Sequence, residues 1–169
     1  MKIRLAGVIE SSLNNGDGIR KVIFAQGCRH KCSGCFNPET HDFDGGYECD
    51  TDKIVKSIND DFIIDGVTFS GGDPFEQALE FAEIAKKIDK DKNIWCYTGY
   101  EWEEILEGIK NGRNDWLELL KCLDVIVVGK FDKTKKSDDI KFAGSVNQRV
   151  LSVPLSLFLD MPISYENLD

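Results

Sequence analysis

Short apolar runs are the most regular feature of the chain, and more polar segments with a helical pattern separate them. Runs of four to six residues that are apolar almost throughout are typical of strands buried on both faces of a parallel sheet. The pattern predicts such strands at residues 20–25, 67–70, 93–97 and 124–128. It also predicts a first strand at residues 2–10 and a last strand that begins near Arg149.

Helices are predicted between the strands, at residues 51–58, 75–89, 101–109 and 115–122. The apolar face predicted for the second of these helices carries Phe75, Ala78, Leu79, Ala82, Ala85 and Ile88. Strands that alternate with helices indicate an α/β fold with a mostly parallel sheet. A complete barrel of eight such units takes about 250 residues. We therefore expect the 169 residues to form a single domain, an incomplete TIM-type β/α barrel that is open on one side.

Each predicted parallel strand is followed by residues that could bind a ligand. These residues are the cysteines Cys28 to Cys35 and the pairs Gly71-Gly72, Thr98-Gly99 and Gly129-Lys130. The carboxyl ends of parallel strands meet at one edge of a sheet, and ligands of such folds bind there. The four segments are therefore predicted to form one site.

Cys28, Cys32 and Cys35 form a CX3CX2C pattern in the first of these segments. Thiolates are soft ligands that suit both zinc and iron–sulfur clusters. A structural zinc site needs four ligands, and either His30 or His41 could supply the fourth, so the spacing leaves a zinc site open. Three thiolates also suit a [4Fe–4S] cluster in which one iron has no protein ligand. The spacing favours the cluster over zinc.

The composition narrows the partners and the compartment. Asp and Glu number 30 against 21 Lys and Arg, for a formal net charge of -9, so we do not expect a nucleic-acid partner. No apolar run is long enough to span a bilayer or to form the core of a signal peptide, which predicts a cytoplasmic protein without a membrane partner. In such a reducing compartment, clustered cysteines indicate a metal site or catalysis rather than a disulfide. Cys96 and Cys122 lie outside the cluster and are interpreted as buried apolar residues.

The CX3CX2C loop after the first buried strand resembles that of the radical S-adenosylmethionine enzymes. The resemblance implies that Cys28, Cys32 and Cys35 hold a [4Fe–4S] cluster with one open iron. The amino and carboxylate groups of S-adenosylmethionine would bind that iron. One electron from the cluster would then split the cofactor into methionine and a 5′-deoxyadenosyl radical.

Residues 70–74, Ser-Gly-Gly-Asp-Pro, resemble the glycine-rich motif that contacts the methionine end of the cofactor in this family. Asp73 is then expected to accept a hydrogen bond from the cofactor's amino group. Many members have an aromatic residue just before the third cysteine, whereas this chain has Gly34 there and Phe36 just after. The residues that the resemblance places against the cofactor are Gly34, Cys35, Phe36, Gly72 and Asp73.

Further segments are similar to narrower groups within the family. Residues 15–20 resemble the entry loop of glycyl-radical activating enzymes, and residues 94–100, 124–131 and 144–149 resemble the activators of anaerobic ribonucleotide reductases. The resemblance implies that the radical takes a hydrogen atom from a glycine of the large subunit of anaerobic ribonucleoside-triphosphate reductase. A flavodoxin or ferredoxin would supply the electron. The matches cover about residues 15–150 and leave the role of residues 151–169 unassigned.

The sequence leaves three alternative functions open. A pyruvate formate-lyase-type activating enzyme would keep the chemistry and change the protein substrate. A radical enzyme acting on a small molecule, such as a deazaguanine synthase, would need substrate-contacting segments for which 169 residues leave little space. A zinc-binding interaction module would use the same cysteines without any catalysis.

Overall fold

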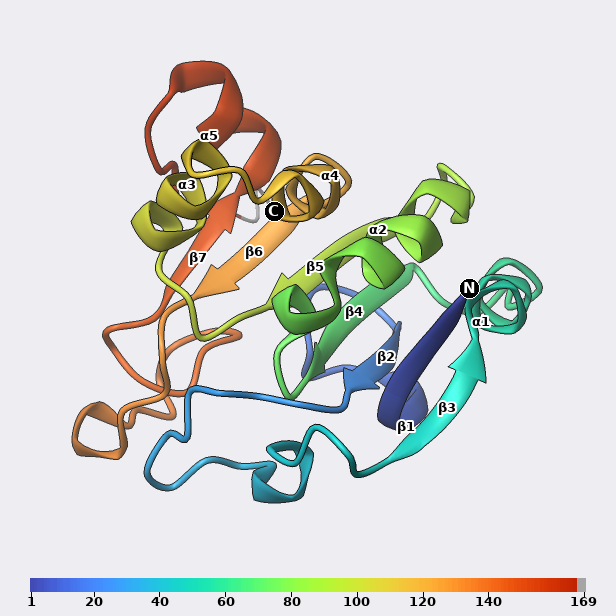
Figure 1. The fold of residues 1–169 in the computed structure, drawn as a ribbon. Helices are drawn as coiled ribbons and strands as arrows, with labels where there is room; N and C mark the ends of the chain where they lie inside the picture. Colours follow the sequence, from blue (N-terminus) through green and yellow to red (C-terminus); the bar gives the residue numbers. More distant parts are fainter. Residues whose placement is uncertain (167–169) are drawn as a thin grey trace.

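Seven strands form one sheet in the computed structural model, which describes residues 1–166 (Figure 1). In chain order the strands are β1 (Lys2–Ser12), β2 (Arg20–Ala25), β3 (Tyr47–Asp50), β4 (Gly66–Gly71), β5 (Asn93–Tyr97), β6 (Val125–Val128) and β7 (Arg149–Ser152). Their order across the sheet is β3-β1-β2-β4-β5-β6-β7, with β3 and β7 at the two edges. The sheet is therefore open, as the sequence predicts.

The centre of the sheet is parallel and its margins are antiparallel. Strands β2, β4, β5 and β6 pair in parallel, whereas β1 pairs antiparallel with β2 and β3, and β7 pairs antiparallel with β6. Strand β3 is not among the predicted strands, because its four residues carry no apolar run. The expectation of an α/β fold with a mostly parallel, open sheet is confirmed, and the margins add antiparallel pairs to it.

Helices follow the strands in the predicted order. They are α1 (Thr51–Asn59), α2 (Ala78–Lys87), α3 (Trp102–Lys110), α4 (Asn114–Leu120) and α5 (Val153–Leu159). The helix predicted at 75–89 begins instead as a 3-10 turn, Pro74–Gln77, and α2 starts only after it. Leu79, assigned to the apolar face of that helix, is 53% exposed, so this part of the prediction is wrong. Helix α5 lies in the segment to which the sequence assigned no role.

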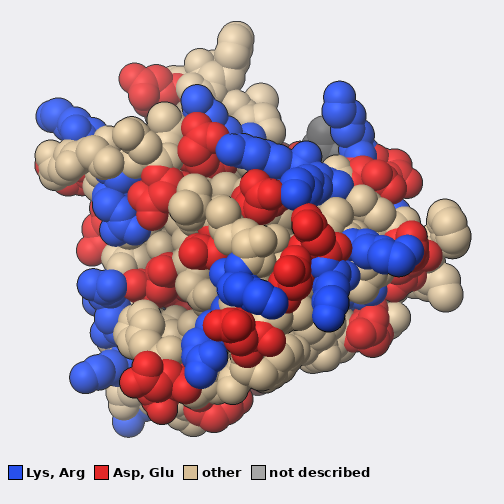
Figure 2. All heavy atoms as spheres, turned by 45° about the vertical axis from the view of Figure 1, so that its right-hand side comes forward, with Lys and Arg blue, Asp and Glu red and all other residues tan. Residues whose placement is uncertain are grey.

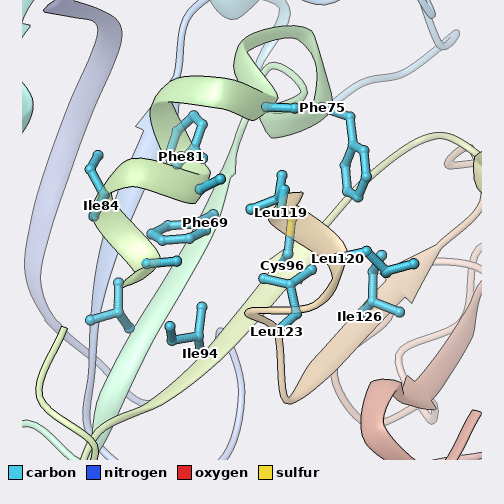
Figure 3. Close-up of a cluster of buried hydrophobic side chains, with 14 of the residues drawn as sticks. Phe69, Phe75, Phe81, Ile84, Ile94, Cys96, Leu119, Leu120, Leu123 and Ile126 are labelled. Atoms are coloured by element: carbon cyan, nitrogen blue, oxygen red, sulfur yellow. The ribbon is translucent and has the colours of Figure 1, made fainter. Parts of the chain in front are cut away.

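The main core lies between one face of the sheet and the helices that cover it (Figure 3). Ile23, Phe69, Cys96 and Ile126 come from four neighbouring strands and are all fully buried there. Full burial of a large apolar side chain contributes about 1.5–3 kcal/mol. Cys96 is one of these core residues, which confirms its interpretation as a buried apolar residue. Cys122 is half-buried, and it packs against the edge of the same core.

The opposite face of the sheet carries a buried arginine near the amino ends of the strands. Arg20 donates from Nε to the hydroxyl of Thr68 at 2.7 Å and from Nη1 to the carbonyl of Asp17 at 2.9 Å. The Thr68 hydroxyl in turn donates to the carbonyl of Asn15 at 2.6 Å. Burial lowers the pKa of Arg20 to about 10. These hydrogen bonds connect the loop after β1 to strands β2 and β4 on this face of the sheet.

The described part of the C-terminal segment, up to residue 166, packs beside β7. After α5 the chain returns along this edge strand, where Ser152 N–H donates to the carbonyl of Ile163 and Tyr165 N–H donates to that of Val150, both at 2.9 Å. The predicted segment 151–169 also includes residues 167–169, which lie outside the described residues. Within residues 1–166, no helix has the length and apolar character needed to cross a membrane.

Charged side chains of both signs are interspersed on the surface shown in Figure 2. Several ion pairs join charged side chains between or within helices. Lys87 of α2 lies 2.9 Å from Asp52 of α1 and 2.7 Å from Glu83 one turn earlier in its own helix. Lys86 pairs with Glu118 of α4 at 2.6 Å. At these helices, basic residues are therefore balanced locally by acidic ones.

Candidate metal centre

A cavity at the carboxyl ends of the parallel strands brings the predicted cysteines together. Cys28, Cys32 and Cys35 all line this space of about 120 Å³, which we call the cysteine cavity. Its wall also includes Gly71 at the end of β4 and residues that follow β4, β5 and β6, namely Gly72, Thr98, Gly99 and Gly129. The four strand-end segments thus meet at one cavity, where the sequence predicts a common site.

The three cysteines are free thiols in partly or fully buried positions. Burial raises the pKa of Cys28 to about 11, and it also raises the pKa of Cys32. In the metal-free chain, Cys28 and Cys32 therefore hold their protons more tightly than a solvent-exposed thiol does. A metal centre that binds thiolates must displace those protons, so its binding becomes stronger as the pH rises.

The cysteines share the cavity without converging on a single point. Within residues 1–166, no three His, Cys, Asp or Glu side chains are grouped so as to hold one metal ion. A four-iron cluster has different requirements, because each cysteine binds a different iron. The fourth zinc ligand considered from the sequence was His30 or His41. The structure gives these two histidines very different surroundings.

His30 lies inside the CX3CX2C loop, and its side chain is engaged by a buried carboxylate. Its Nε2 lies 2.6 Å from Oδ2 of Asp73, and Asp73 is fully buried. The same carboxylate accepts hydrogen bonds from the hydroxyl of Thr98 at 2.9 Å and from the backbone N–H groups of Gly99 and Phe75, both at 3.0 Å. Asp73 therefore joins the cysteine loop to the ends of β4 and β5, and it has four protein donors of its own.

A second carboxylate joins the same segments nearer the surface. Arg29, next to His30 in the loop, donates to both carboxylate oxygens of Glu76, at 2.8 and 2.6 Å. The hydroxyl of Tyr100 donates to Glu76 at 2.7 Å, and the Tyr100 ring packs edge-on against His30 with 4.5 Å between the ring centres. The sequence predicts no role for Arg29, Glu76 or Tyr100. Arg29 and Tyr100 lie inside segments that it does single out, 28–35 and 94–100, and Glu76 lies two residues after the motif 70–74.

Two glycines of the recognised motifs make room for the cysteine loop. A Cβ atom at Gly72 would lie 2.4 Å from the carbonyl oxygen of Gly27, just before Cys28. A Cβ atom at Gly99 would lie 2.5 Å from Cδ2 of His30. Both distances are shorter than any real contact of this kind. Glycine is required at these positions because the protein's own loop passes so close.

His41 differs from His30 in the hydrogen bonding of its side chain. It also lines the cysteine cavity, yet its Nε2 is buried and has no hydrogen-bond partner among the described residues. Buried polar atoms almost always have a partner, and each exception calls for an explanation, such as a bound water, ion or other group. Together with three soft sulfur donors, this unpartnered nitrogen fits a site built around an additional group.

A larger cavity of about 670 Å³ lies directly beside the cysteine cavity, and we call it the large cavity. The two cavities share four wall residues, Ser70, Tyr97, Phe131 and Gln148. Phe24, Ser70 and Tyr97 belong to the sheet face opposite the core, because side chains alternate between the two faces along each strand. The volume lies within the range of about 300–1,000 Å³ typical of small-molecule sites.

Aromatic side chains from loops complete the large cavity. The rings of Phe36 and Phe131 pack together with 4.7 Å between their centres, and Phe142 lies on another wall. The hydroxyl of Tyr97 donates to the carbonyl of Phe142 at 2.7 Å. Of these three residues, the sequence predicts a role only for Phe36; Phe131 and Phe142 lie in loop segments, which carry no periodic signal.

The five residues expected against the cofactor occupy different places. Cys35 and Gly72 line the cysteine cavity, and Phe36 lines the large cavity. Gly34 packs close to the Phe131 ring rather than into either cavity wall. Asp73 lies behind the wall, where protein donors surround its carboxylate.

Comparison with known proteins shows to which family the chain belongs. Residues 14–151 match the model of the 4Fe-4S single cluster domain. The anaerobic ribonucleoside-triphosphate reductase-activating protein of Enterobacteria phage T4 is 36% identical over 145 residues, which is 82% of this chain and 86% of that protein. Its counterpart from Haemophilus influenzae is 34% identical over 143 residues (79% and 88%), and that of Escherichia coli (strain K12) is 31% identical over 145 residues (80% and 90%).

The chain belongs to the anaerobic ribonucleoside-triphosphate reductase-activating proteins. The domain match includes both cavities' strand ends and all three clustered cysteines, and it stops before α5. For this activating protein, a 4Fe–4S cluster is thus supported by two independent observations. One is the family of the domain, and the other is the set of three free thiols around one cavity.

Proposed function

We propose that this activating protein works by radical S-adenosylmethionine chemistry and generates a glycyl radical on the large subunit of anaerobic ribonucleoside-triphosphate reductase. Cys28, Cys32 and Cys35 would hold the [4Fe–4S] cluster and leave one iron open. The observation that carries this proposal is the contact between two cavities. The smaller cavity is lined by the thiols. The larger cavity lies on the sheet face opposite the core and has the volume for a nucleoside-containing cofactor.

When bound, the cluster and S-adenosylmethionine would supply a 5′-deoxyadenosyl radical, which takes the hydrogen atom from the reductase glycine. The protein's own residues have simpler tasks. Phe36, Phe131 and Phe142 would exclude water from the large cavity, because their rings form its apolar walls. Cys35 and Gly72 would lie against the methionine end of the cofactor, at the wall of the cysteine cavity.

Asp73 takes a different part in this proposal from the direct contact that the sequence suggested. Its carboxylate already receives donors from His30, Thr98, Gly99 and Phe75. We assign it the positioning of the cysteine loop relative to the turn after β5. Gly34 would help to shape the same loop, because its φ of +75° is a backbone conformation that favours glycine.

The reductase would present its glycine-bearing segment at the large cavity. The cavity is bordered by loops, including Asn14 and Asn15 on one side and residues 136–144 on another. Loops are better suited than strands to adapt to a protein substrate. A flavodoxin or ferredoxin would supply the electron, and we place the protein in the cytoplasm, where such donors and the reductase occur together.

Anaerobic reconstitution with iron and sulfide tests the proposal. We expect about four irons and four sulfides per chain. With a chemical reductant the protein should cleave S-adenosylmethionine to methionine and 5′-deoxyadenosine, and it should generate a glycyl-radical EPR signal in an anaerobic ribonucleotide reductase.

The alternatives give different outcomes in the same experiment. A radical signal on pyruvate formate-lyase instead of the reductase would indicate the other activating enzyme. Cofactor cleavage that produces no radical on either protein would favour a small-molecule substrate. Tightly bound zinc with no cofactor cleavage would contradict the proposal and support a binding module.

A further inference from the structure

Among residues 1–166, three buried side-chain atoms lack a hydrogen-bond partner, and one of them belongs to a residue of the cysteine cavity. They belong to His41, Thr51 and Asn147. Of these residues, His41 alone lines the cavity that holds Cys28, Cys32 and Cys35. A buried donor or acceptor without a partner is costly, because it has lost its hydrogen bonds to water. A group bound in this cavity would supply the partner that the Nε2 atom of His41 lacks among the described residues.

The backbone holds His41 firmly beside the cysteine loop. The N–H of Gly27 donates to the carbonyl of Thr40 at 2.7 Å, and the N–H of Cys28 donates to the carbonyl of His41 at 3.2 Å. The N–H of His41 donates to the carbonyl of Pro38 at 3.2 Å. Residues 40–41 thus run alongside residues 27–28. The imidazole is attached to the same segment that carries the first thiol.

The second histidine of the cavity shows what distinguishes His41. His30 also lines the cavity, but its Nε2 is 2.6 Å from the Asp73 carboxylate and is therefore used within the protein. His41 has no such partner at its Nε2. One histidine thus holds the loop in place, and the other has a nitrogen that remains available to a bound group.

The chemistry of the cavity indicates which group this is. A cluster bound to the three thiols fills the space with sulfide and thiolate sulfur atoms, and these accept hydrogen bonds. An imidazole with its proton on Nε2 is a suitable donor. If His41 bound iron instead, it would occupy the open position that the cofactor needs.

We infer that His41 donates a hydrogen bond from Nε2 to a sulfur atom of the cluster and thereby raises the cluster's reduction potential. Such bonds stabilise the reduced cluster more than the oxidised one, because the reduced form carries more negative charge. The inference rests on the part of the proposed function that places the cluster on these cysteines. It does not depend on S-adenosylmethionine cleavage or on the identity of the reductase.

The first test compares the reduction potentials of reconstituted wild-type protein, His41→Phe and His41→Gln by an EPR-monitored redox titration without S-adenosylmethionine. His41→Phe should shift the potential to a more negative value. At a fixed potential its ratio of reduced to oxidised cluster should fall by up to about tenfold, which corresponds to about 59 mV for one electron. His41→Gln keeps an N–H donor and should restore most of the wild-type potential.

Equal potentials in wild type and His41→Phe, with intact clusters in both, would overturn the inference. A wild-type protein that binds no cluster would instead contradict the proposed function, so the two failures are distinguishable.

A second measurement covers the case in which His41→Phe does not fold or does not bind the cluster. It uses pulsed EPR of the reduced wild-type cluster after labelling with ¹⁵N-histidine and exchange into D₂O. We expect a weak ¹⁵N coupling together with an exchangeable deuteron near the cluster. A strong ¹⁵N coupling, as from a nitrogen bound to iron, would overturn the inference, and so would the absence of any histidine coupling.

Discussion

On one face of strands β2, β4 and β5, the side chains of Ile23, Phe69 and Cys96 are fully buried against helices. On the other face the next residues along the same strands, Phe24, Ser70 and Tyr97, line the large cavity. The first face is closed mainly by apolar contacts with the helices. The second is bordered by loops that polar contacts hold in place. The same strands therefore serve stability on one face and ligand binding on the other, and substitutions on the two faces should have separable effects.

Among substitutions in the loops, Cys32→Ala is expected to have the largest effect on cluster binding and cofactor cleavage. Two cysteines cannot hold a cluster that needs three, so bound iron and S-adenosylmethionine cleavage should be lost. Cys122→Ala is the matched control, because Cys122 is half-buried beside the core and lies away from the cysteine cavity. It should retain iron and cleavage. Equal loss in both variants, measured by iron analysis and product chromatography, would show that the ligands are misassigned.

On the helix-covered face, Phe69→Ala should lower the free energy of unfolding by about 3–5 kcal/mol, because it removes a fully buried ring from the core. The Phe69 ring packs against Phe81 with 4.7 Å between centres. Urea denaturation of the metal-free chain measures this loss. At temperatures where the variant is folded, it should still bind a full cluster. Complete loss of the cluster in folded Phe69→Ala would mean that the two faces are not independent.

A smaller effect is expected from Asp73→Asn, which replaces a buried carboxylate with an amide of the same shape. Hydrogen bonds to a charged group contribute about 1.5–3 kcal/mol each, and the amide can keep only part of them. We expect unfolding to become easier by about 2–3 kcal/mol and the cluster to be lost faster on exposure to a chelator.

Glu76→Gln is the control for this prediction. It affects the link between Glu76 and Arg29, whose side chains are 5% and 66% exposed, and the Gln oxygen can still accept hydrogen bonds from Arg29 or Tyr100, so we expect a smaller loss of stability. An Asp73→Asn variant no less stable than Glu76→Gln would contradict the role assigned to Asp73.

The smallest effect concerns pH. Burial raises the pKa of Cys28 from 9.0 to about 11 in the folded metal-free chain. The folded state therefore keeps the thiol proton more tightly than the unfolded state. This contribution to stability is complete below pH 9 and disappears as the pH rises towards 11. The difference in unfolding free energy between wild type and Cys28→Ala should shrink by about 1–2 kcal/mol across this window. A difference that stays constant or grows with pH would contradict this assignment.

The comparison of the two faces also explains what could be predicted from sequence. The strands β2 and β5 were predicted with correct bounds, because buried parallel strands give unbroken apolar runs. The meeting of Cys28, Gly72 and Thr98 at one cavity followed from the rule that ligands bind at the carboxyl ends of parallel strands. These features depend on regular strands, and regular secondary structure gives a recognisable pattern of apolar residues in the sequence.

The features that could not be predicted lie in loops and at the edges of the sheet. Three of the four donors of Asp73, in His30, Thr98 and Gly99, are far from it in the chain, as Arg29 is from Glu76, and no local pattern signals such pairs. Phe131 and Phe142 reach the large cavity from irregular segments. The unpartnered nitrogen of His41 becomes visible only when burial and hydrogen bonds are known for every atom.

Mössbauer spectroscopy of the ⁵⁷Fe-reconstituted protein, with and without S-adenosylmethionine, tests the central claim most directly. A cluster held by Cys28, Cys32 and Cys35 has one open iron, so adding the cofactor should change about one quarter of the iron signal and leave the rest in place. A spectrum that is unchanged by S-adenosylmethionine, or that shows four equivalent sulfur-ligated irons, would contradict the account.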